Sequence, residues 1–306
     1  MKKEAYDILI IGAGPAGLTA GIYSARNGLK TGVISKDIGG TANSILLLEN
    51  WPGFKGTGAD LMKQIYEQLM TYKIEFFMEE VKSITKEEKE FNVKTDKKEF
   101  TAKAIIIATG TERKKLNIKG EKELLGKGVS YCVTCDSFFF KNRTVGVIGG
   151  SDCAATSALA LSDIAKKVYV IYRKGELRCE DITSEKLKKK KNVELIYNVT
   201  PVEILGKEKV EGIILKEKDK NKEIKLDGVF IEVGANPITE LLKGLNLKLD
   251  EEKHIIVDEN MKTSVPGIFG AGDVTHHKLK QVIVSAGHGA IAAKSAYDYL
   301  SKLESH

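Results

Sequence analysis

The chain has 306 residues, of which 42% are hydrophobic and 29% charged, and its formal net charge is +6. This is the composition of a globular protein, and the length exceeds what one hydrophobic core usually serves, so we expect two domains. No apolar run reaches the about 18 residues of a membrane helix, and the lysines are mixed with acids, so we expect neither a membrane nor a nucleic-acid partner.

A β-α-β unit is predicted at the start of the chain. Its apolar strand, glycine turn, helix and second strand occupy residues 6–11, 12–17, 18–28 and 30–36. The turn, GAGPAG, has the G-x-G-x-x-G spacing of dinucleotide-binding folds. There Gly12 would make the tight turn, Gly14 would let the backbone approach a pyrophosphate, and Gly17 would let helix and strand pack closely. The phosphates would then lie at the positive end of the helix.

A second unit of the same kind is predicted near the middle of the chain. Its strand, glycine turn, helix and next strand occupy residues 143–149, 149–154, 155–165 and 166–174. Just before it stand Cys132 and Cys135, two of the four cysteines, in a Cys-x-x-Cys motif followed by Asp136. By itself that motif leaves three readings open: a metal site, a structural disulfide and a redox dithiol. Two dinucleotide folds around such a pair suggest electron transfer between two bound cofactors.

The remaining predicted elements complete the first fold. Residues 104–115 (AIIIATGTERKK) begin as a strand that ends in Ala-Thr-Gly110, which we interpret as a crossing point of the chain. Near the C-terminus, 267–269 would be a strand, Gly272 and Asp273 a turn that faces a ligand, and 281–300 a long helix.

Six segments resemble the low-molecular-weight thioredoxin reductases in order and spacing. They are GAGPAG (12–17), ENWPGF (49–54), IIIATG (105–110), CVTCDSFFF (132–140), GANPIT (234–239) and GIFGAGDV (267–274), and the match runs from about residue 6 to about 300. The resemblance implies an α/β protein with two Rossmann-like dinucleotide-binding domains of three layers, the second inserted into the first. An FAD-binding domain would comprise 1–113 and 241–306, and a pyridine-nucleotide-type domain would comprise 114–240. Two hinges, near 112–116 and 238–243, and a homodimer are also implied.

The resemblance favours the redox reading of the cysteine pair. Zinc needs about four ligands, and no histidine stands at a finger spacing, so we expect no metal. A disulfide across two residues would stabilise little, and the cytosol would tend to reduce it. By resemblance, Cys135 faces and reacts with the flavin, Cys132 attacks the disulfide of the partner protein, and Asp136 moves protons. Asp136 could instead, or also, cap a helix.

FAD is the first cofactor that the resemblance implies. The resemblance assigns FAD binding to Gly12, Gly14, Pro15, Ala16, Gly17, Thr41, Asn50, Gly110, Gly272, Asp273, Gln281 and Val282. Thr41 departs from the family, because GGTANS stands where a Gly-Gly-Gln sequence is usual. The second strand ends in Ser35-Lys36, without the acid that often binds a ribose.

NADPH is the second implied cofactor, and its site departs further from the family pattern. The resemblance assigns NADPH binding to Gly149, Gly150, Ser151, Arg173, Lys174 and Arg178. Ser151 replaces the glycine that lets the backbone touch a pyrophosphate, and the usual carboxylate pair is missing from the following helix. The three basic residues fit a 2′-phosphate, or form a solvated basic turn. NADPH is favoured over NADH because no acid stands where the 2′-hydroxyl of NADH would need one, and Glu176 is only the nearest candidate.

We therefore expect a flavoprotein disulfide reductase that passes electrons from NAD(P)H through FAD and the dithiol to thioredoxin. A thioredoxin reductase fed by ferredoxin or a reduced deazaflavin is the alternative, and the basic surface would fit an acidic ferredoxin. A redox-sensing flavoprotein without turnover is the third hypothesis. The N-terminal lysines and ILIIGAG lack the length and cleavage pattern of a signal peptide, so we expect a cytoplasmic protein.

Overall fold

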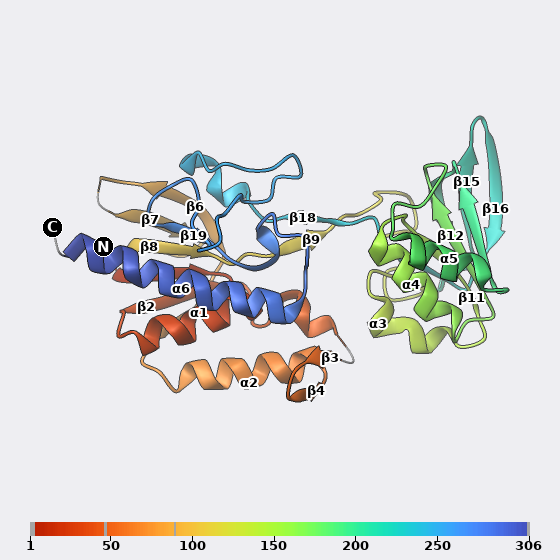
Figure 1. Ribbon diagram of the computed structural model, residues 1–306. Helices are drawn as coiled ribbons and strands as arrows, with labels where there is room; N and C mark the ends of the chain where they lie inside the picture. Colours follow the sequence, from red (N-terminus) through yellow and green to blue (C-terminus); the bar gives the residue numbers. More distant parts are fainter. Residues whose placement is uncertain (1–3, 46–47, 89, 305–306) are drawn as a thin grey trace. The chain divides into compact units, whose positions relative to one another are not determined.

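The computed structural model describes residues 4–45, 48–88 and 90–304. The chain divides into two compact units (Figure 1): unit 1 runs up to Glu112 and resumes at Asn236, and unit 2 is Arg113–Ala235. The boundaries expected from the sequence were 113/114 and 240/241, and the two units divide at 112/113 and 235/236. The two chain crossings, β9 (Thr111–Arg113) and β18 (Ala235–Pro237), pair as a two-stranded sheet.

Unit 1 is built on one sheet whose strands run in the order β5-β2-β1-β8-β7-β6, with β19 also paired to β8. The strands are β1 (Glu4–Ile11), β2 (Thr31–Ser35), β5 (Glu75–Met78), β6 (Val81–Lys86), β7 (Phe91–Thr95), β8 (Glu99–Ile107) and β19 (Ile268–Gly270). The long strand β8 pairs along one edge with β1 and shares its other edge between antiparallel β7 and parallel β19. The carboxyl ends of β2, β1, β8 and β19 therefore meet at one edge, where ligands of open α/β sheets bind.

Three helices accompany this sheet, namely α1 (Pro15–Arg26), α2 (Gly58–Met70) and α6 (Val282–Glu304). Helices α1 and α6 run side by side (Figure 1), and a Cβ on Gly289 would lie 2.1 Å from the Ala16 carbonyl oxygen. Helix α1 begins three residues before the predicted start at 18, because proline is well suited to a first position that needs no N–H. The capping box between Thr57 and Asp60 starts α2.

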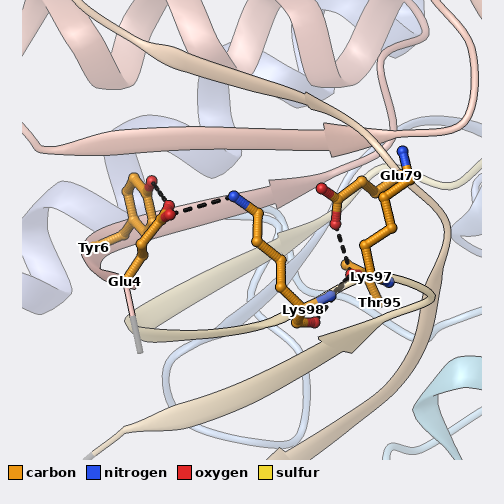
Figure 2. Close-up of polar contacts among 6 residues, drawn as sticks. All are labelled: Glu4, Tyr6, Glu79, Thr95, Lys97 and Lys98. Carbon is orange, nitrogen blue, oxygen red and sulfur yellow. Dashed lines mark hydrogen bonds and ion pairs between the residues drawn. The ribbon is translucent and has the colours of Figure 1, made fainter. Parts of the chain in front are cut away.

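The end of β7 and the turn that follows it are joined to the parallel strands by polar contacts (Figure 2) and by one cation–aromatic contact. Lys98 Nζ lies 3.2 Å from Glu4 Oε1, and Tyr6 donates to the same carboxylate at 3.0 Å. Thr95 Oγ1 donates to Glu79, which directly follows β5, at 2.6 Å. The Lys98 ammonium also lies 4.3 Å from the centre of the Phe77 ring. These contacts tie the turn between β7 and β8 to β1 and β5.

Short segments of unit 1 lie around this framework. They are η1 (Gly40–Ser44), β3 (Leu48–Trp51), β4 (Phe54–Gly56), η3 (Glu240–Leu245) and η4 (Gly272–Val274). Segments η1 and η4 matter for the candidate site, because they follow β2 and β19 at the carboxyl edge of the sheet.

Unit 2 has a parallel sheet in the order β10-β17-β11-β12-β13 and an antiparallel sheet β14-β15-β16. The parallel strands are β10 (Val129–Ser130), β11 (Thr144–Ile148), β12 (Lys167–Tyr172), β13 (Val193–Tyr197) and β17 (Gly228–Ile231). The antiparallel strands are β14 (Thr200–Leu205), β15 (Gly212–Glu217) and β16 (Lys220–Lys225). The helical segments are α3 (Val133–Asp136), η2 (Ser137–Phe140), α4 (Asp152–Ser162) and α5 (Asp181–Lys189). The lysine-rich run at 185–194 thus belongs partly to α5 and partly to β13.

Successive side chains along the parallel strands of unit 2 point to opposite faces of the sheet, so each face has its own hydrophobic core. Val145 and Val147 of β11 pack with α4, whereas Ile148 packs with the antiparallel strands through residues such as Ile213 and Leu215. Unit 2 therefore has three layers, a helical layer, the parallel sheet and the antiparallel sheet. The two β-α-β frameworks, the second inserted into the first, confirm the predicted α/β fold class.

Candidate functional site

The first glycine turn leaves one position open toward solvent. A Cβ on Gly12 would lie 2.3 Å from the Ala108 carbonyl oxygen, and a Cβ on Gly17 would lie 1.8 Å from the Gly12 carbonyl oxygen. Both glycines are therefore required by the packing of the chain itself. A Cβ on Gly14 would meet nothing nearer than the Gly39 carbonyl oxygen at 4.0 Å. Gly14 also has an ordinary extended conformation, with φ −75° and ψ −171°, so no internal contact requires glycine there.

The start of α1 presents backbone donors beside this open position. Gly14 is the N-cap residue and makes no side-chain capping bond, and the first turn carries no acidic residue. The Ala13 amide is already satisfied by Ser35 Oγ at 3.2 Å, so Ser35 supports the turn from the end of β2. An uncapped helix start with space above it favours an anionic group such as a pyrophosphate.

A half-buried carboxylate lies at the same edge of the sheet. Asp273, in η4, accepts a hydrogen bond from Ser285 Oγ at 3.1 Å, and burial raises the pKa of its carboxyl group. Gly272 has φ +78°, and a Cβ there would lie 3.0 Å from the Ala16 side chain, so η4 lies directly against α1. Lys280 Nζ donates to the Asp273 carbonyl oxygen at 2.9 Å. A carboxylate can accept up to about four hydrogen bonds, so Asp273 has capacity for ligand hydroxyl groups.

The residues predicted to bind FAD all belong to unit 1. The structure places Gly12, Gly14, Pro15, Ala16 and Gly17 in the turn and the start of α1, Thr41 in η1, Asn50 in β3, Gly110 after β8, Gly272 and Asp273 in η4, and Gln281 and Val282 at the start of α6. Asn50 Nδ2 donates to Gln281 Oε1 at 3.0 Å, which joins segments 231 positions apart. Gly110, in contrast, accepts a hydrogen bond from the Ile238 amide at the other chain crossing.

These features of unit 1 fit a dinucleotide such as FAD. The open position at Gly14 and the uncapped amides of α1 suit its pyrophosphate, and the Asp273 carboxylate suits the hydroxyls of its ribitol chain. Thr41 is exposed at the start of η1, and a Cβ on the preceding Gly40 would lie 3.6 Å from the Gly14 Cα, so η1 adjoins the turn.

The cysteine motif lies in unit 2, between β10 and η2. Cys132 is disulfide-bonded, whereas Cys153 and Cys179 are free thiols. The backbone of Cys135 lies in α3, and its side chain is outside the described part of the structure. Asp136 donates its amide to the Cys132 carbonyl oxygen at 3.2 Å. It occupies the N-cap position of η2 without a side-chain capping bond, so capping does not account for its carboxylate.

The segment before Cys132 is fixed by two polar contacts. Ser130 Oγ accepts from the Cys132 amide at 2.9 Å. Tyr131 donates to Glu121 at 2.6 Å, and burial and this carboxylate raise the pKa of the phenol. Glu121 is 4% exposed and also accepts from the amides of Leu116 and Asn117. One buried carboxylate therefore links the chain that follows β9 to the residue beside the disulfide.

The second glycine turn is packed more closely than the first. A Cβ on Gly149 would lie 2.3 Å from the Glu232 carbonyl oxygen, and a Cβ on Gly150 would lie 2.4 Å from the Tyr172 ring. Both glycines are thus required by internal packing. Ser151 is the N-cap residue of α4, with φ −88° and ψ 175°, and its side chain makes no capping bond.

The basic residues predicted for a 2′-phosphate lie in the loop after β12. Arg173, Lys174 and Arg178 are all exposed. Arg178 is brought to the glycine turn, because its amide donates to the Gly150 carbonyl oxygen at 2.6 Å and its Nε donates to Tyr172 at 2.9 Å. A cationic loop beside a glycine turn is compatible with a phosphate monoester.

Sequence reasoning missed a buried carboxylate at this turn. Glu232 directly follows β17, and its carboxylate accepts from Arg113 Nη1 and from Ser157 Oγ, both at 3.0 Å. Burial raises the pKa of Glu232. The signal was present in the sequence, since GVFIEVG places an acid directly after an apolar strand.

Within residues 4–45, 48–88 and 90–304, no three His, Cys, Asp or Glu side chains are grouped as metal ligands. None of the helices in these ranges is long and apolar enough to cross a membrane.

Comparisons with known proteins agree on one family. The sequence profile of the pyridine nucleotide-disulphide oxidoreductases matches residues 6–289. Thioredoxin reductase of Listeria innocua is 39% identical over 309 residues, which cover 99% of this chain and 96% of that protein. Thioredoxin reductase of Lactococcus lactis, in a crystal structure of its FR conformation, aligns with a TM-score of 0.83 at 36% identity and covers 97% of this chain and 99% of that chain.

A ferredoxin-flavin thioredoxin reductase from Clostridium acetobutylicum is also similar. It aligns with a lower TM-score of 0.56 at 34% identity, covering 99% of this chain and all of that one. The full-length identities, the family profile and the two β-α-β frameworks agree with one another. This chain belongs to the pyridine nucleotide-disulphide oxidoreductase family and, within it, to the low-molecular-weight thioredoxin reductases.

Proposed function

We propose that this protein is an FAD-dependent thioredoxin-disulfide reductase that takes its electrons from NADPH. The observation that carries the proposal is the disulfide at Cys132, in a Cys-x-x-Cys motif between two dinucleotide-binding folds. Unit 1 is the FAD-binding domain, and unit 2 is the pyridine-nucleotide-type domain that carries the cysteines.

Residues at the carboxyl edge of the unit 1 sheet would hold FAD. Gly14 and the α1 amides would accommodate the pyrophosphate, Asp273 would accept from the ribitol hydroxyls, and the hydrogen-bonded pair Asn50 and Gln281 would contact the ring system. Bound FAD supplies a two-electron carrier between the nucleotide and the disulfide.

The cysteines perform the exchange with thioredoxin. Reduction of the Cys132–Cys135 disulfide consumes two electrons and two protons and gives two thiols. The Cys132 thiolate then attacks one sulfur of the thioredoxin disulfide, which forms a mixed disulfide and releases one thioredoxin thiolate. Cys135 attacks Cys132 Sγ, re-forms the internal disulfide and releases the second thioredoxin thiolate. Asp136, whose amide is bonded to the Cys132 carbonyl group, supplies and removes the protons.

The surface beside the disulfide suits a protein substrate. Phe138 and Phe139 follow the motif in η2, and they are 78% and 75% exposed. Their rings lie edge to face, 6.4 Å apart. Exposed neighbouring aromatic side chains are typical of interaction surfaces, and here they lie within four residues of Cys135. Thioredoxin is the partner because the curated relatives are named for its reduction.

NADPH binds at the glycine turn of unit 2. Arg173, Lys174 and Arg178 provide three cationic side chains for its 2′-phosphate, and Gly149, Gly150 and Ser151 form the turn. Rotation of unit 2 about β9 and β18 would let the dithiol serve first the flavin and then thioredoxin. The proposal includes a homodimer and a cytoplasmic location, the compartment in which a dithiol is kept reduced.

A donor other than NADPH is favoured by one observation. Ser151 carries a side chain at the position that is open in the first turn, where a pyrophosphate would approach. Ferredoxin, or a reduced deazaflavin, is therefore the alternative donor, and the Clostridium acetobutylicum relative is named for ferredoxin. An anaerobic titration separates the two. Stoichiometric bleaching of the flavin by NADPH supports the proposal, whereas bleaching by dithionite alone transfers the donor role to the alternative.

The cysteine roles are tested by a trapping experiment. In Cys135→Ser, Cys132 has no internal thiol to displace it, so mixing with oxidised thioredoxin should accumulate a mixed disulfide of one to one stoichiometry. Non-reducing electrophoresis and mass spectrometry detect the adduct. Cys132→Ser is the matched control and should trap much less. Trapping through Cys135 instead would reverse the two roles.

A further inference from the structure

A buried carboxylate, paired with a half-exposed arginine, lies where the second dinucleotide would bind. Glu232 follows β17, and Gly149 follows the neighbouring parallel strand β11. The two residues adjoin, since a Cβ on Gly149 would lie 2.3 Å from the Glu232 carbonyl oxygen. The carboxyl ends of neighbouring parallel strands border the crevice in which α/β sheets bind their ligands. The Glu232 side chain, only 6% exposed, therefore lies at the base of that crevice.

The carboxylate is held in one orientation by two different elements. Its Oε2 accepts from Arg113 Nη1 and its Oε1 accepts from Ser157 Oγ of α4, both at 3.0 Å. Each carboxylate oxygen can accept a second hydrogen bond. Arg113 is 46% exposed, and an ion pair with a solvent-exposed partner contributes little net stability, so stability is a weak reason for the presence of this pair.

The charge of this group restricts what it can bind. A carboxylate accepts hydrogen bonds and repels phosphate oxygens, so Glu232 is unsuited to either phosphate group of NADPH. Cations for the 2′-phosphate are present elsewhere, in the loop after β12 that holds Arg173, Lys174 and Arg178. A dinucleotide lies across the crevice, so its adenosine half follows that loop and its other half extends past the glycine turn. The donors on that other half are the ribose hydroxyls and the carboxamide.

We propose that Glu232, oriented by Arg113 and Ser157, accepts hydrogen bonds from the uncharged donors of the nicotinamide half of NADPH. Arg113 and Ser157 are positioning residues that act through Glu232. The inference rests on the proposed use of NADPH as donor.

The test compares two ligands on the oxidised holoenzyme by isothermal titration calorimetry. NADP⁺ carries both halves, and adenosine 2′,5′-bisphosphate lacks the nicotinamide half. Glu232→Gln should weaken NADP⁺ binding about tenfold, the loss expected when a hydrogen bond to a charged group becomes neutral. The same variant should bind adenosine 2′,5′-bisphosphate within twofold of the unaltered enzyme. Ser157→Ala, a milder change, should weaken NADP⁺ about threefold and leave the half-ligand unaffected.

A matched control is available in the same unit. Glu203 pairs with Lys119 at 2.7 Å on β14, outside the crevice, and Glu203→Gln should change neither affinity. Unchanged NADP⁺ binding in Glu232→Gln and Ser157→Ala would overturn the inference while the proposed function stands. Equal weakening of both ligands would also overturn it, by showing a general distortion of the crevice. An unaltered enzyme that binds neither ligand would refute the NADPH donor itself, and the inference with it.

Discussion

The two glycine turns of this chain have nearly the same backbone and different surroundings. Gly14 and Ser151 are both N-cap residues of the helix that follows, with φ and ψ of −75° and −171° in the first turn and −88° and 175° in the second. Any residue can adopt this conformation, so the backbone does not require glycine at either position. The first turn keeps the position open toward a ligand, and the second has a side chain there.

The glycines of one motif can be required for different reasons, either by packing within the chain or by space for a ligand. Gly12, Gly17, Gly149 and Gly150 are all accounted for by close contacts within the chain. No close contact within the chain accounts for Gly14, and space for an external group explains this glycine best. Unit 1 therefore carries stronger evidence for a bound dinucleotide than unit 2, although both turns are rich in glycine.

The largest expected effect comes from filling the open position. Gly14→Val places branched carbons where the pyrophosphate is proposed to lie, at a φ that valine adopts readily. We expect FAD affinity to fall at least a hundredfold while the apoprotein melts at an unchanged temperature. Flavin fluorescence titration measures the first and differential scanning fluorimetry the second. Gly17→Ala should instead impair folding, because its Cβ would lie 1.8 Å from the Gly12 carbonyl oxygen. Normal FAD binding by Gly14→Val would remove the distinction between the turns.

The second prediction uses a free thiol beside the second turn. Cys153 is exposed at the second position of α4. Alkylation of the oxidised protein with N-ethylmaleimide should therefore slow flavin reduction by NADPH at least tenfold, because the added group covers the crevice. Reduction by dithionite should keep its rate. Cys153→Ser should be insensitive to the reagent, and equal inhibition of that variant would assign the effect to Cys179.

The smallest expected effect comes from making the turns alike. Ser151→Gly removes the side chain from the position that corresponds to Gly14, so NADP⁺ should bind about threefold to fivefold more tightly. Calorimetry on the oxidised holoenzyme measures the change. FAD content should stay constant, since Ser151 belongs to unit 2. Weaker NADP⁺ binding would mean that the hydroxyl group contacts the ligand.

Local patterns predicted much of the fold. The strand, turn, helix and strand at the N-terminus lie close to their expected residues, because β-branched runs and glycine turns act over short distances. The start of α1 differs because the first residues of the motif, from Pro15 on, already belong to the helix. The antiparallel strands β14–β16 were not predicted, since each has only six residues and β16, with three lysines, has a weak apolar pattern.

Local sequence patterns predicted less of the candidate site than of the fold. The disulfide at Cys132 and the loop with Arg178 followed from motifs that are contiguous in sequence. The bond between Asn50 and Gln281 and the bond between Arg113 and Glu232 join distant segments, and only the folded chain brings them together. Glu232 is the most instructive case, because an acid in an apolar run is visible in the sequence but its partners are not.

The pairing of β9 with β18 has a consequence for how such a chain can evolve. The polypeptide leaves unit 1 and returns to it at neighbouring points, so the inserted unit begins and ends at adjacent places. Adjacent ends are the condition under which a domain can be gained, exchanged or excised without rethreading the host sheet. In this architecture unit 2 can be replaced as a block, and any partner it recognises with it, while the sheet of unit 1 stays intact.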